Sequence, residues 1–474
     1  MKTKTTKQKP EPPAEGARAV VWPRAAKSRA AKPRADKPRA ASAQATAPRV
    51  TEPRVTEPQR GESRLAAPAR VKPQAPRSRR VAASKPRLRL VKSAPDRARS
   101  SVVLVVSVGC PAGIGPEVSL AAALARSKRR AKAGDPSEPC VLVGDLKTLQ
   151  IAAGLLGVGA RCLVPFDLSR DGAPRPLRGA VYVYDPGARV AARDRKPGKP
   201  TVSSGAAQLA WVEAAYQLCK QLNQQEHIRA ALVTGPVSKH AIATSGVPGA
   251  EAFLGHTEWL QALDGAATSV MCFAAKQLTT SLVSTHFPLS AVPEQIRAET
   301  VEAAIVALVE LLRALGNAAP KVAVCSLNPH AGEGELLGAE ERTAIVPGIE
   351  RARRALAAAG GATGRQSVLP KPSRGAKATP GAAQILGPIG AETAFRKAMS
   401  KVYDGVVAMY HDQATIPMKL VAFGEAVNVT AGLSVVRTSV DHGTGYDIAW
   451  RGAADSAGML AALDLAAALV RARG

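Results

Sequence analysis

The chain has 474 residues and a formal net charge of +28, which is distributed unevenly. The first hundred residues contain 27 Lys or Arg against 7 Asp or Glu, so they carry +20 of that total. The remainder is only mildly basic, and the tail and the body therefore need separate interpretations. No apolar run reaches the roughly twenty residues that a bilayer-spanning helix needs, so we expect no membrane partner.

The N-terminal tail, residues 1–100, is rich in Ala, Pro, Arg and Lys and contains near-repeats such as AKPRADKPRA. Frequent prolines prevent a continuous helix, and sparse apolar side chains cannot offset the entropy of ordering. We therefore expect a disordered tail, without the apolar stretch of a signal peptide. A solvated, non-specific tail is favoured over one that binds nucleic acid or another polyanion through counterion release.

The body, residues 101–474, alternates apolar runs with helical patterns. Continuous apolar runs predict buried strands, and they lie at 101–110, 140–145, 227–236, 279–289, 321–330 and 403–412. Helical patterns lie at about 116–132, 205–224, 293–315 and 340–359. This alternation predicts an α/β fold with helices on both faces of a parallel or mixed sheet. The segment 360–381 is predicted to be an exposed loop.

The six cysteines of the chain are scattered and form no CxxC pair. This pattern is typical of reduced thiols in the cytoplasm and argues against a thiolate zinc site.

Three of the seven histidines directly follow predicted strands. His286 follows SLVST, His330 follows VAVCSLNP, and His411 follows VVAMY. Any one of them alone could be a structural histidine. Together at one edge of a sheet they predict a site for zinc or another divalent metal that leaves a position open for substrate.

Further polar groups accompany these histidines. Lys419, Asn428 and Arg437 follow His411 and offer two cations and an amide that suit a phosphate or carboxylate. HTE (256–258) adds an imidazole and a hydroxyl. The loop GCPAGIGPE (109–117) could present backbone N–H groups to an anion, although a plain strand-to-helix turn explains it equally well.

These segments together resemble the 4-hydroxythreonine-4-phosphate dehydrogenase family, over about residues 102 to 470. The resemblance rests on these motifs in the same order: VGCPAGIGPE, VTGPVSK (233–239), FLGHTE (253–258), STHFPL (284–289), LNPHAGEGELLGAEE (327–341), GPIGAET (387–393), AMYHDQ (408–413), NVTAGLSVVRTSVDHGT (428–444) and DIAWRG (447–452). It implies a two-subdomain α/β/α architecture like that of isocitrate and isopropylmalate dehydrogenases. It also implies a homodimer with an active site shared between subunits.

The resemblance assigns roles to individual residues. The metal ligands would be His286, His330 and His411, contributed by both subunits. The substrate contacts would be His256, Thr257, Lys419, Asn428 and Arg437. The contacts to NAD or NADP would be His442, Gly443, Thr444 and Asp447, in a stretch that resembles the adenosine-binding loop of isopropylmalate dehydrogenases. Asp412 is a candidate proton acceptor, with a metal-bound water as the alternative, and Lys419 would help to fix the reacting carbon.

The implied reaction oxidises 4-phosphohydroxy-L-threonine to a 2-amino-3-oxo acid phosphate, which decarboxylates to 3-amino-2-oxopropyl phosphate in pyridoxal phosphate biosynthesis. A divalent metal, with zinc preferred over magnesium or cobalt, would support the oxidation. One alternative within the fold is a paralogue that oxidises 4-phosphoerythronate or phosphothreonate. Another is a nucleic-acid-associated protein that acts through its tail.

Several positions depart from the family pattern, and they leave the proposed ligands and anion contacts in place. They are Cys110, Ser238, Glu392, Ala414 and Trp450, together with a longer 360–381 loop and the basic tail. Trp450 replaces a usually small residue in the adenosine loop, so it bears most directly on nucleotide preference.

Overall fold

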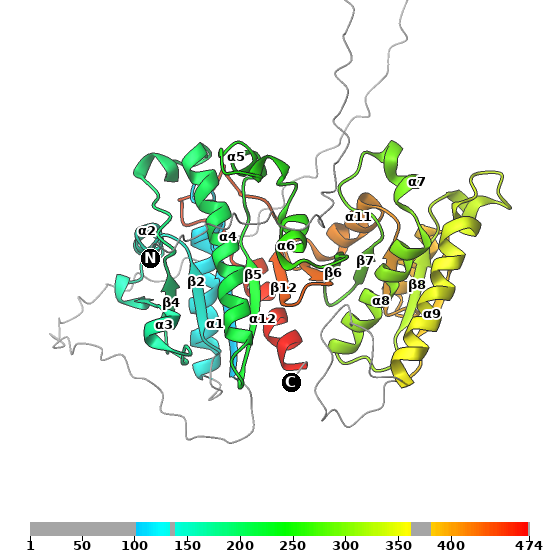
Figure 1. Cartoon of the computed structure of the whole chain (residues 1–474), viewed down its shortest axis with the longest axis horizontal. Coiled ribbons are helices and arrows are strands. Elements are labelled where there is room, and N and C mark those ends of the chain that lie inside the picture. The colour runs from blue at the N-terminus through cyan, green and yellow to red at the C-terminus, as the bar shows by residue number, and fades with distance from the viewer. Residues whose placement is uncertain (1–100, 133–137, 362–380, 473–474) are drawn as a thin grey trace, which may run out of the picture. The chain divides into compact units, whose positions relative to one another are not determined.

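The computed structural model describes residues 101–132, 138–361 and 381–472 (Figure 1). The expected disordered tail lies outside the described residues, as does nearly all of the expected 360–381 loop. In the part that is described, no helix is long and apolar enough to cross a membrane.

Among the described residues, twelve strands form one mixed sheet in the order β3-β4-β2-β1-β5-β12-β11-β6-β7-β10-β8-β9. Their bounds are β1 Ser101–Ser107, β2 Cys140–Val143, β3 Leu163–Pro165, β4 Val181–Tyr184, β5 Ile228–Thr234, β6 Val270–Ala274, β7 Thr279–Leu282, β8 Lys321–Cys325, β9 Gln384–Ile389, β10 Gly405–Ala408, β11 Val427–Ala431 and β12 Val436–Val440. The predicted strands are all present, usually a few residues shorter than their apolar runs. The expected mixed α/β class is confirmed.

The sheet reverses direction near its middle. Strand β12 is parallel to β5, but β11 is antiparallel to both β12 and β6, and β6 is antiparallel to β7. Strand β10 then pairs in parallel with both β7 and β8. The carboxyl ends of β7, β10 and β8 therefore lie at one edge, as expected for the strands that precede the three histidines, while β5 and β12 run the opposite way.

Helices cover both faces of the sheet (Figure 1). Helix α4 packs on β1 and β5, and α12 also packs on these strands, beside α1. Around the later strands, α8 packs on β6, β7, β8 and β10, whereas α10 and α11 contact β8, β10 and β7. The helix bounds are α1 Gly115–Lys132, α2 Leu146–Leu155, α3 Leu168–Asp171, α4 Val202–Asn223, α5 Lys239–Ala243, α6 His256–Asp264, α7 Val292–Gln295, α8 Ala298–Ala314, α9 Val346–Gly361, α10 Ala391–Met399, α11 His411–Ala422 and α12 Ala457–Ala472.

The core explains the continuous apolar runs in the sequence. Residues 102–106 of β1 are buried on both faces of the sheet, and Trp211 and Tyr216 of α4 are fully buried against it. A separate cluster joins β6, β7 and β10 to α10 and α11, and includes Phe273 and Met418. One sheet continues through both clusters, so the division into two subdomains stays a prediction.

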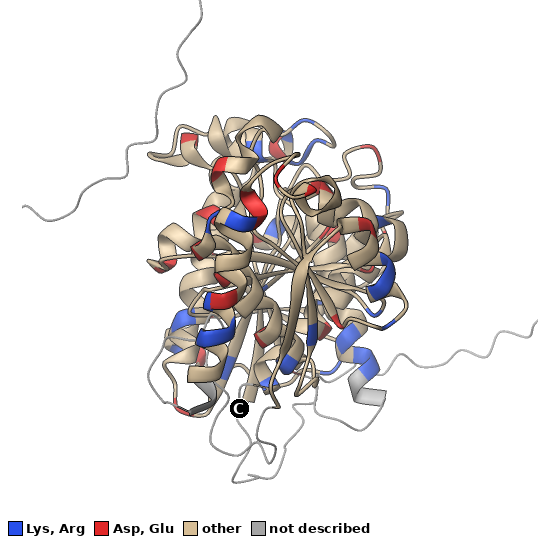
Figure 2. Ribbon diagram, turned by 90° about the vertical axis from the view of Figure 1, so that its right-hand side faces the viewer, with Lys and Arg blue, Asp and Glu red and all other residues tan. Residues whose placement is uncertain are grey.

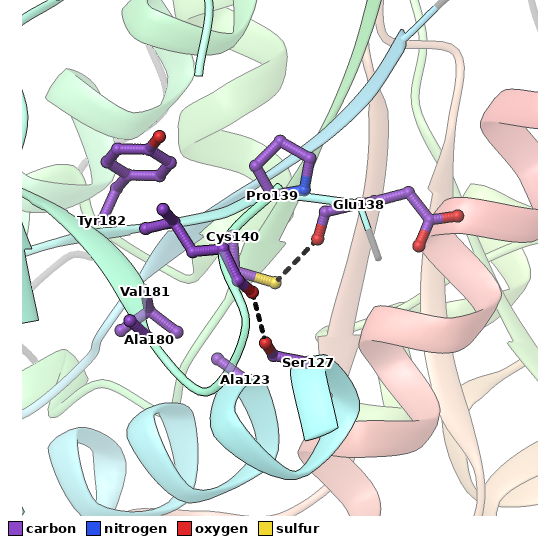
Figure 3. Close-up of a pocket in the computed structure, with 9 residues that line it drawn as sticks. Ala123, Ser127, Glu138, Pro139, Cys140, Ala180, Val181 and Tyr182 are labelled. Atoms are coloured by element: carbon purple, nitrogen blue, oxygen red, sulfur yellow. Dashed lines mark hydrogen bonds between the residues drawn. The ribbon is translucent and has the colours of Figure 1, made fainter. Parts of the chain in front are cut away.

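Charges in the body are mixed rather than of one sign. Figure 2 shows basic and acidic residues interspersed along the helices that flank the twisted sheet. A small hollow at the amino ends of β2 and β4 is lined mainly by apolar side chains, and there Cys140 and Ser127 bond to backbone carbonyls (Figure 3). Because its polar groups are already engaged and it is nearly closed, this hollow is not a candidate site.

Candidate active site

An open pocket lies over the strands where the sheet reverses direction. Its floor comes from β6, β11 and β12, and its walls come from segments that follow β5, β7, β10 and β12. The lining residues with polar or charged side chains are Lys239, His256, Thr257, Glu258, His286, His411, Asn428, Arg437, Ser439, Asp441 and His442. Six of the predicted metal and substrate residues thus meet in one pocket.

The position of this pocket differs partly from the expectation that ligands lie beyond the carboxyl ends of the strands. Asn428 is registered opposite Phe273 on β6 and opposite Ser439 on β12, while Arg437 is registered opposite Thr430. Since alternate residues of a strand share a face, Asn428, Arg437 and Ser439 point to the same side of the sheet. Part of the site is therefore a sheet face rather than a sheet edge.

His286 and His411 form a pair in this pocket, with ring centroids 5.6 Å apart. In each ring Nδ1 already faces a carboxylate: Glu258 Oε1 lies 3.2 Å from His286, and Asp412 Oδ1 lies 2.7 Å from His411. An imidazole whose Nδ1–H is donated to a carboxylate keeps its Nε2 lone pair free, which is the arrangement found around metal-binding histidines. The pair therefore fits a divalent cation.

His330 does not line this pocket, although β8 neighbours β10 in the sheet. It lies in an exposed turn after β8 and adopts a positive φ of 51°. Within the residues that the structure describes, no three His, Cys, Asp or Glu side chains of a single chain are grouped to hold a metal. One chain therefore brings two of the three predicted ligands together.

Arg437 supplies a buried positive charge. Its side chain is 2% exposed, and its guanidinium donates to the hydroxyls of Thr234 and Thr430 rather than to a carboxylate. Burial lowers the pKa of Arg437 to about 10, while the charge of Glu258 opposes this change. A buried cation held only by hydroxyls is costly to stability, so it is best explained by an anionic ligand.

Within the part of the chain that the structure describes, several buried polar atoms around the pocket lack a hydrogen-bond partner. They are His256 Nε2, Glu258 Oε2, Asn428 Oδ1 and His442 Nε2. Unsatisfied buried polar atoms are rare in folded proteins, and four in one pocket indicate that it is built to bind a polar molecule. Burial, with the charges of Arg437 and Lys239, lowers the pKa of His256 well below its ordinary value, so this imidazole is neutral.

The predicted nucleotide contacts are divided between the pocket and an adjoining loop. His442 and Gly443 line the pocket, and a side chain added at Gly443 would meet open space. Thr444 instead packs on the 109–115 turn, where its carbonyl accepts from Ile114 N at 2.9 Å. Asp447 is exposed and does not line the pocket. Open space beside the unpartnered Nε2 of His442 fits a nucleotide at this loop.

Asp412 and Lys419 lie outside the pocket lining. The Asp412 side chain is 69% exposed and contacts the His411 ring, so its geometry suits orientation of that ring; its role as proton acceptor stays a prediction. Lys419, on α11, is exposed, and its charge acts on the carboxyl of Asp441. Burial nevertheless raises the pKa of Asp441 above its usual range.

Sequence reasoning missed three charged residues that line the pocket: Lys239, Glu258 and Asp441. Each stands beside or inside a quoted motif, VTGPVSK, FLGHTE or SVDHGT, and that proximity was the available signal. Burial raises the pKa of Glu258. The hydrogen bond with His286 and other nearby contacts lower it by more, so the pKa of Glu258 is lowered overall.

The departures from the family pattern have structural explanations at four positions. Cys110 is buried with Sγ 3.9 Å from the Tyr446 hydroxyl, Ser238 caps α5, and Ala414 is buried in α11. Trp450 adopts a positive φ of 59° and donates its indole N–H to Pro111 O at 2.8 Å. Trp450 therefore holds the 443–452 loop against the 109–115 turn. Nothing in the structure explains the Glu392 replacement, which pairs with a neighbouring arginine at the surface.

A pocket of unpartnered polar groups on an α/β sheet, with one buried guanidinium, defines an enzyme for a small anionic molecule. The profile of the family described as "Pyridoxal phosphate biosynthetic protein PdxA" matches residues 136–466. The chain belongs to this family, whose curated relatives are largely named 4-hydroxythreonine-4-phosphate dehydrogenase.

The alignments with individual relatives cover nearly the whole length of each relative. The 4-hydroxythreonine-4-phosphate dehydrogenase of Acidithiobacillus ferrooxidans is 38% identical over 78% of this chain and 97% of its own. A relative from Bradyrhizobium diazoefficiens, provisionally named a D-threonate 4-phosphate dehydrogenase, is 33% identical over 77% of this chain and 95% of its own. The crystal structure of the Klebsiella pneumoniae 4-hydroxythreonine-4-phosphate dehydrogenase matches with a TM-score of 0.58 and 30% identity, covering 78% of this chain and all of that one.

Proposed function

We propose that this protein oxidises 4-phosphohydroxy-L-threonine with NAD or NADP and a divalent metal, in the synthesis of pyridoxal phosphate. The observation that carries the proposal is the convergence of His256, Thr257, His286, His411, Asn428 and Arg437 on one pocket. These residues are six of the eight that the family resemblance assigns to substrate and metal, and they come from five different segments. Family membership supplies the reaction class.

The residues of the pocket divide between anion binding and cation binding. Arg437 is charged and holds spare N–H donors for a phosphate or carboxylate, and Lys419 lies near enough to influence Asp441. His256 is neutral, so its free Nε2 can accept or donate according to its tautomer, whereas the free carbonyl oxygen of Asn428 can accept from substrate polar groups. Fixing both ends of a short substrate would orient the hydroxyl-bearing carbon.

His286 and His411 would hold the cation, with Zn²⁺ favoured and Mg²⁺ or Co²⁺ as alternatives. A bound divalent cation would lower the pKa of the substrate hydroxyl, and a nicotinamide beside His442 and Gly443 would take the hydride. His330 supplies the third imidazole in this proposal, from the partner subunit.

A homodimer that shares its sites is supported by exposed apolar side chains close to these ligands in the sequence. Leu336, six residues after His330, is 82% exposed, and Leu420 and Phe423, after His411, are 81% and 82% exposed. Large apolar side chains at such exposure are typical of surfaces that another subunit covers. A symmetric pairing would cover them and would deliver His330 to the opposite pocket.

A second candidate is oxidation of a related phosphorylated hydroxy acid, 4-phosphoerythronate or phosphothreonate. The Bradyrhizobium relative favours it, because its provisional name gives D-threonate 4-phosphate as substrate at similar identity. Binding of nucleic acid through the tail stays a third proposal. The cytoplasm is the compartment that the six free thiols support.

The decisive experiment measures reduction of NAD and NADP with 4-phosphohydroxy-L-threonine, 4-phosphoerythronate and phosphothreonate. Chelation and His411→Ala or His330→Ala should each lower kcat/KM at least about 100-fold, since a Lewis acid supplies several kcal/mol to the transition state. His240→Ala is the matched control, because His240 is exposed on α5 and does not line the pocket. Activity that survives both chelation and substitution would refute metal-assisted oxidation.

A further inference from the structure

Glu258 is placed to act on the proposed metal site through its contact with His286. It lies in the first turn of α6, and its Oε1 is 3.2 Å from Nδ1 of His286, which stands in the loop after β7. Its other oxygen, Oε2, is buried and has no hydrogen-bond partner. A buried carboxylate oxygen without a partner is rare in a folded protein and requires an explanation.

The close approach of Glu258 depends on Gly255. A Cβ built on Gly255 would lie 3.0 Å from Glu258 Oε2 and 3.6 Å from Nζ of Lys239. The absent side chain leaves room for the carboxylate and the ammonium on the same side of the backbone. Gly255 therefore provides the space in which Glu258 approaches His286, and the contact with His286 Nδ1 holds its Oε1 there.

The chemistry of the contact fixes the tautomer of His286. An ionised carboxylate has acceptors only, so the hydrogen between Glu258 and His286 must be on Nδ1. A neutral His286 then carries its lone pair on Nε2, the nitrogen that is available to a cation. The negative charge of Glu258 would also offset the positive charge of a cation bound near the buried Arg437.

We propose that Glu258 is a positioning residue of the cation site, which sets the tautomer and orientation of His286 and adds negative charge behind it. This inference rests on the metal dependence proposed above. The matching contact on the other ligand, between Asp412 and His411, is weaker support for a cation, because Asp412 is 69% exposed against 31% for Glu258. Solvent screens the more exposed charge, so Glu258 should contribute more.

The test measures Co²⁺ binding to the metal-free full-length protein by calorimetry and by the visible absorption of the bound ion. Glu258→Leu should weaken Co²⁺ binding about 10- to 100-fold, the usual range for loss of a partner of a metal-bound imidazole. Glu258→Gln should lose less, because its amide oxygen still accepts from Nδ1–H, and it should shift the Co²⁺ absorption band only slightly. Asp412→Asn should have a smaller effect than Glu258→Leu.

Glu213→Gln is the matched control, since Glu213 is also a half-buried carboxylate and bonds Trp259 of the same helix α6. It should bind Co²⁺ as the wild type does. If His411→Ala loses Co²⁺ but Glu258→Leu, folded by circular dichroism, keeps wild-type affinity, the inference is wrong and the proposed metal dependence stands. If the wild type itself binds no Co²⁺, both are wrong. Should Glu258→Leu fail to fold, wild-type affinity and spectrum in both Glu258→Gln and Glu258→Asp would overturn the inference.

Discussion

His256 illustrates how burial decides the state of a single residue in this pocket. Its Nε2 is buried without a partner, and the charges of Arg437 and Lys239 further disfavour a proton on the ring. In the unfolded chain the same imidazole titrates near its ordinary pKa of 6.5. The imidazole can therefore bind a proton in the unfolded chain but not in the folded one. This difference makes the free energy of unfolding depend on pH.

We expect the wild type to lose stability relative to His256→Asn as the pH falls below about 6.5. Below that pH the unfolded imidazole binds a proton and the native one does not, so the free energy of unfolding falls by up to about 1.4 kcal/mol per pH unit. The loss ends at the lowered pKa of the native ring. Chemical denaturation of both proteins between pH 5 and pH 8 measures this loss of stability. If the free energy of unfolding changes with pH in the same way in both proteins, the native ring titrates normally.

At the scale of single residues, the sequence predicts which residues belong to the site better than it predicts which of them lie together. His286, His411 and Arg437 were identified from strand ends and from family motifs, and all three line the pocket. Glu258 and Asp441 were missed because a carboxylate has no distinctive pattern until the fold brings an imidazole or a cation beside it. His330 was also identified from the sequence, but it does not line the pocket of its own chain.

At the scale of elements, the long apolar strands were predictable because burial on both faces leaves a continuous run. The strands that carry Asn428 and Arg437 were not predicted, since β11 and β12 mix polar and apolar residues. Asn428, Arg437 and Ser439 face the pocket, and these polar residues interrupt the apolar run by which a buried strand is recognised. The reversal of the sheet at β11 depends on pairing between distant segments, which local pattern does not reveal.

The contact between the 109–115 turn and the 443–452 loop gives a test of the nucleotide site. A Cβ on Gly113 would lie 2.5 Å from the carbonyl oxygen of Thr444, so Gly113→Ala must push the loops apart. We expect the KM for NAD to rise about 10-fold and stability to fall by about 1–3 kcal/mol, the usual cost of overpacking. Steady-state kinetics and thermal unfolding measure both quantities.

Gly154→Ala is the control for that substitution. Gly154 lies in α2, and an added Cβ would meet nothing within 4 Å. Because alanine favours helix, stability should be unchanged or should rise by up to about 1 kcal/mol. An unchanged KM for NAD in Gly113→Ala would mean that the nucleotide does not use this pair of loops.

At the scale of the whole molecule, one chain contains an incomplete set of the proposed ligands. His286 and His411 lie together, whereas His330 stands in an exposed turn after a neighbouring strand. The His286–His411 pair of one chain provides only two ligand nitrogens. A zinc site needs at least three protein ligands to hold the ion firmly. Symmetric pairing resolves this shortage, since each chain would donate its turn to the other.

Mixing two inactive variants tests this arrangement directly. In a shared site, a heterodimer of His330→Ala with His411→Ala has one pocket with both substitutions and one pocket with neither. Random exchange of equal amounts makes half of the dimers heterodimers, so about a quarter of wild-type activity should return. Mixing His286→Ala with His411→Ala is the control: both residues belong to one chain's pocket, so every pocket stays defective. Recovery in both mixtures, or in neither while subunit exchange is shown by mass, would contradict a site completed by His330 of the partner subunit.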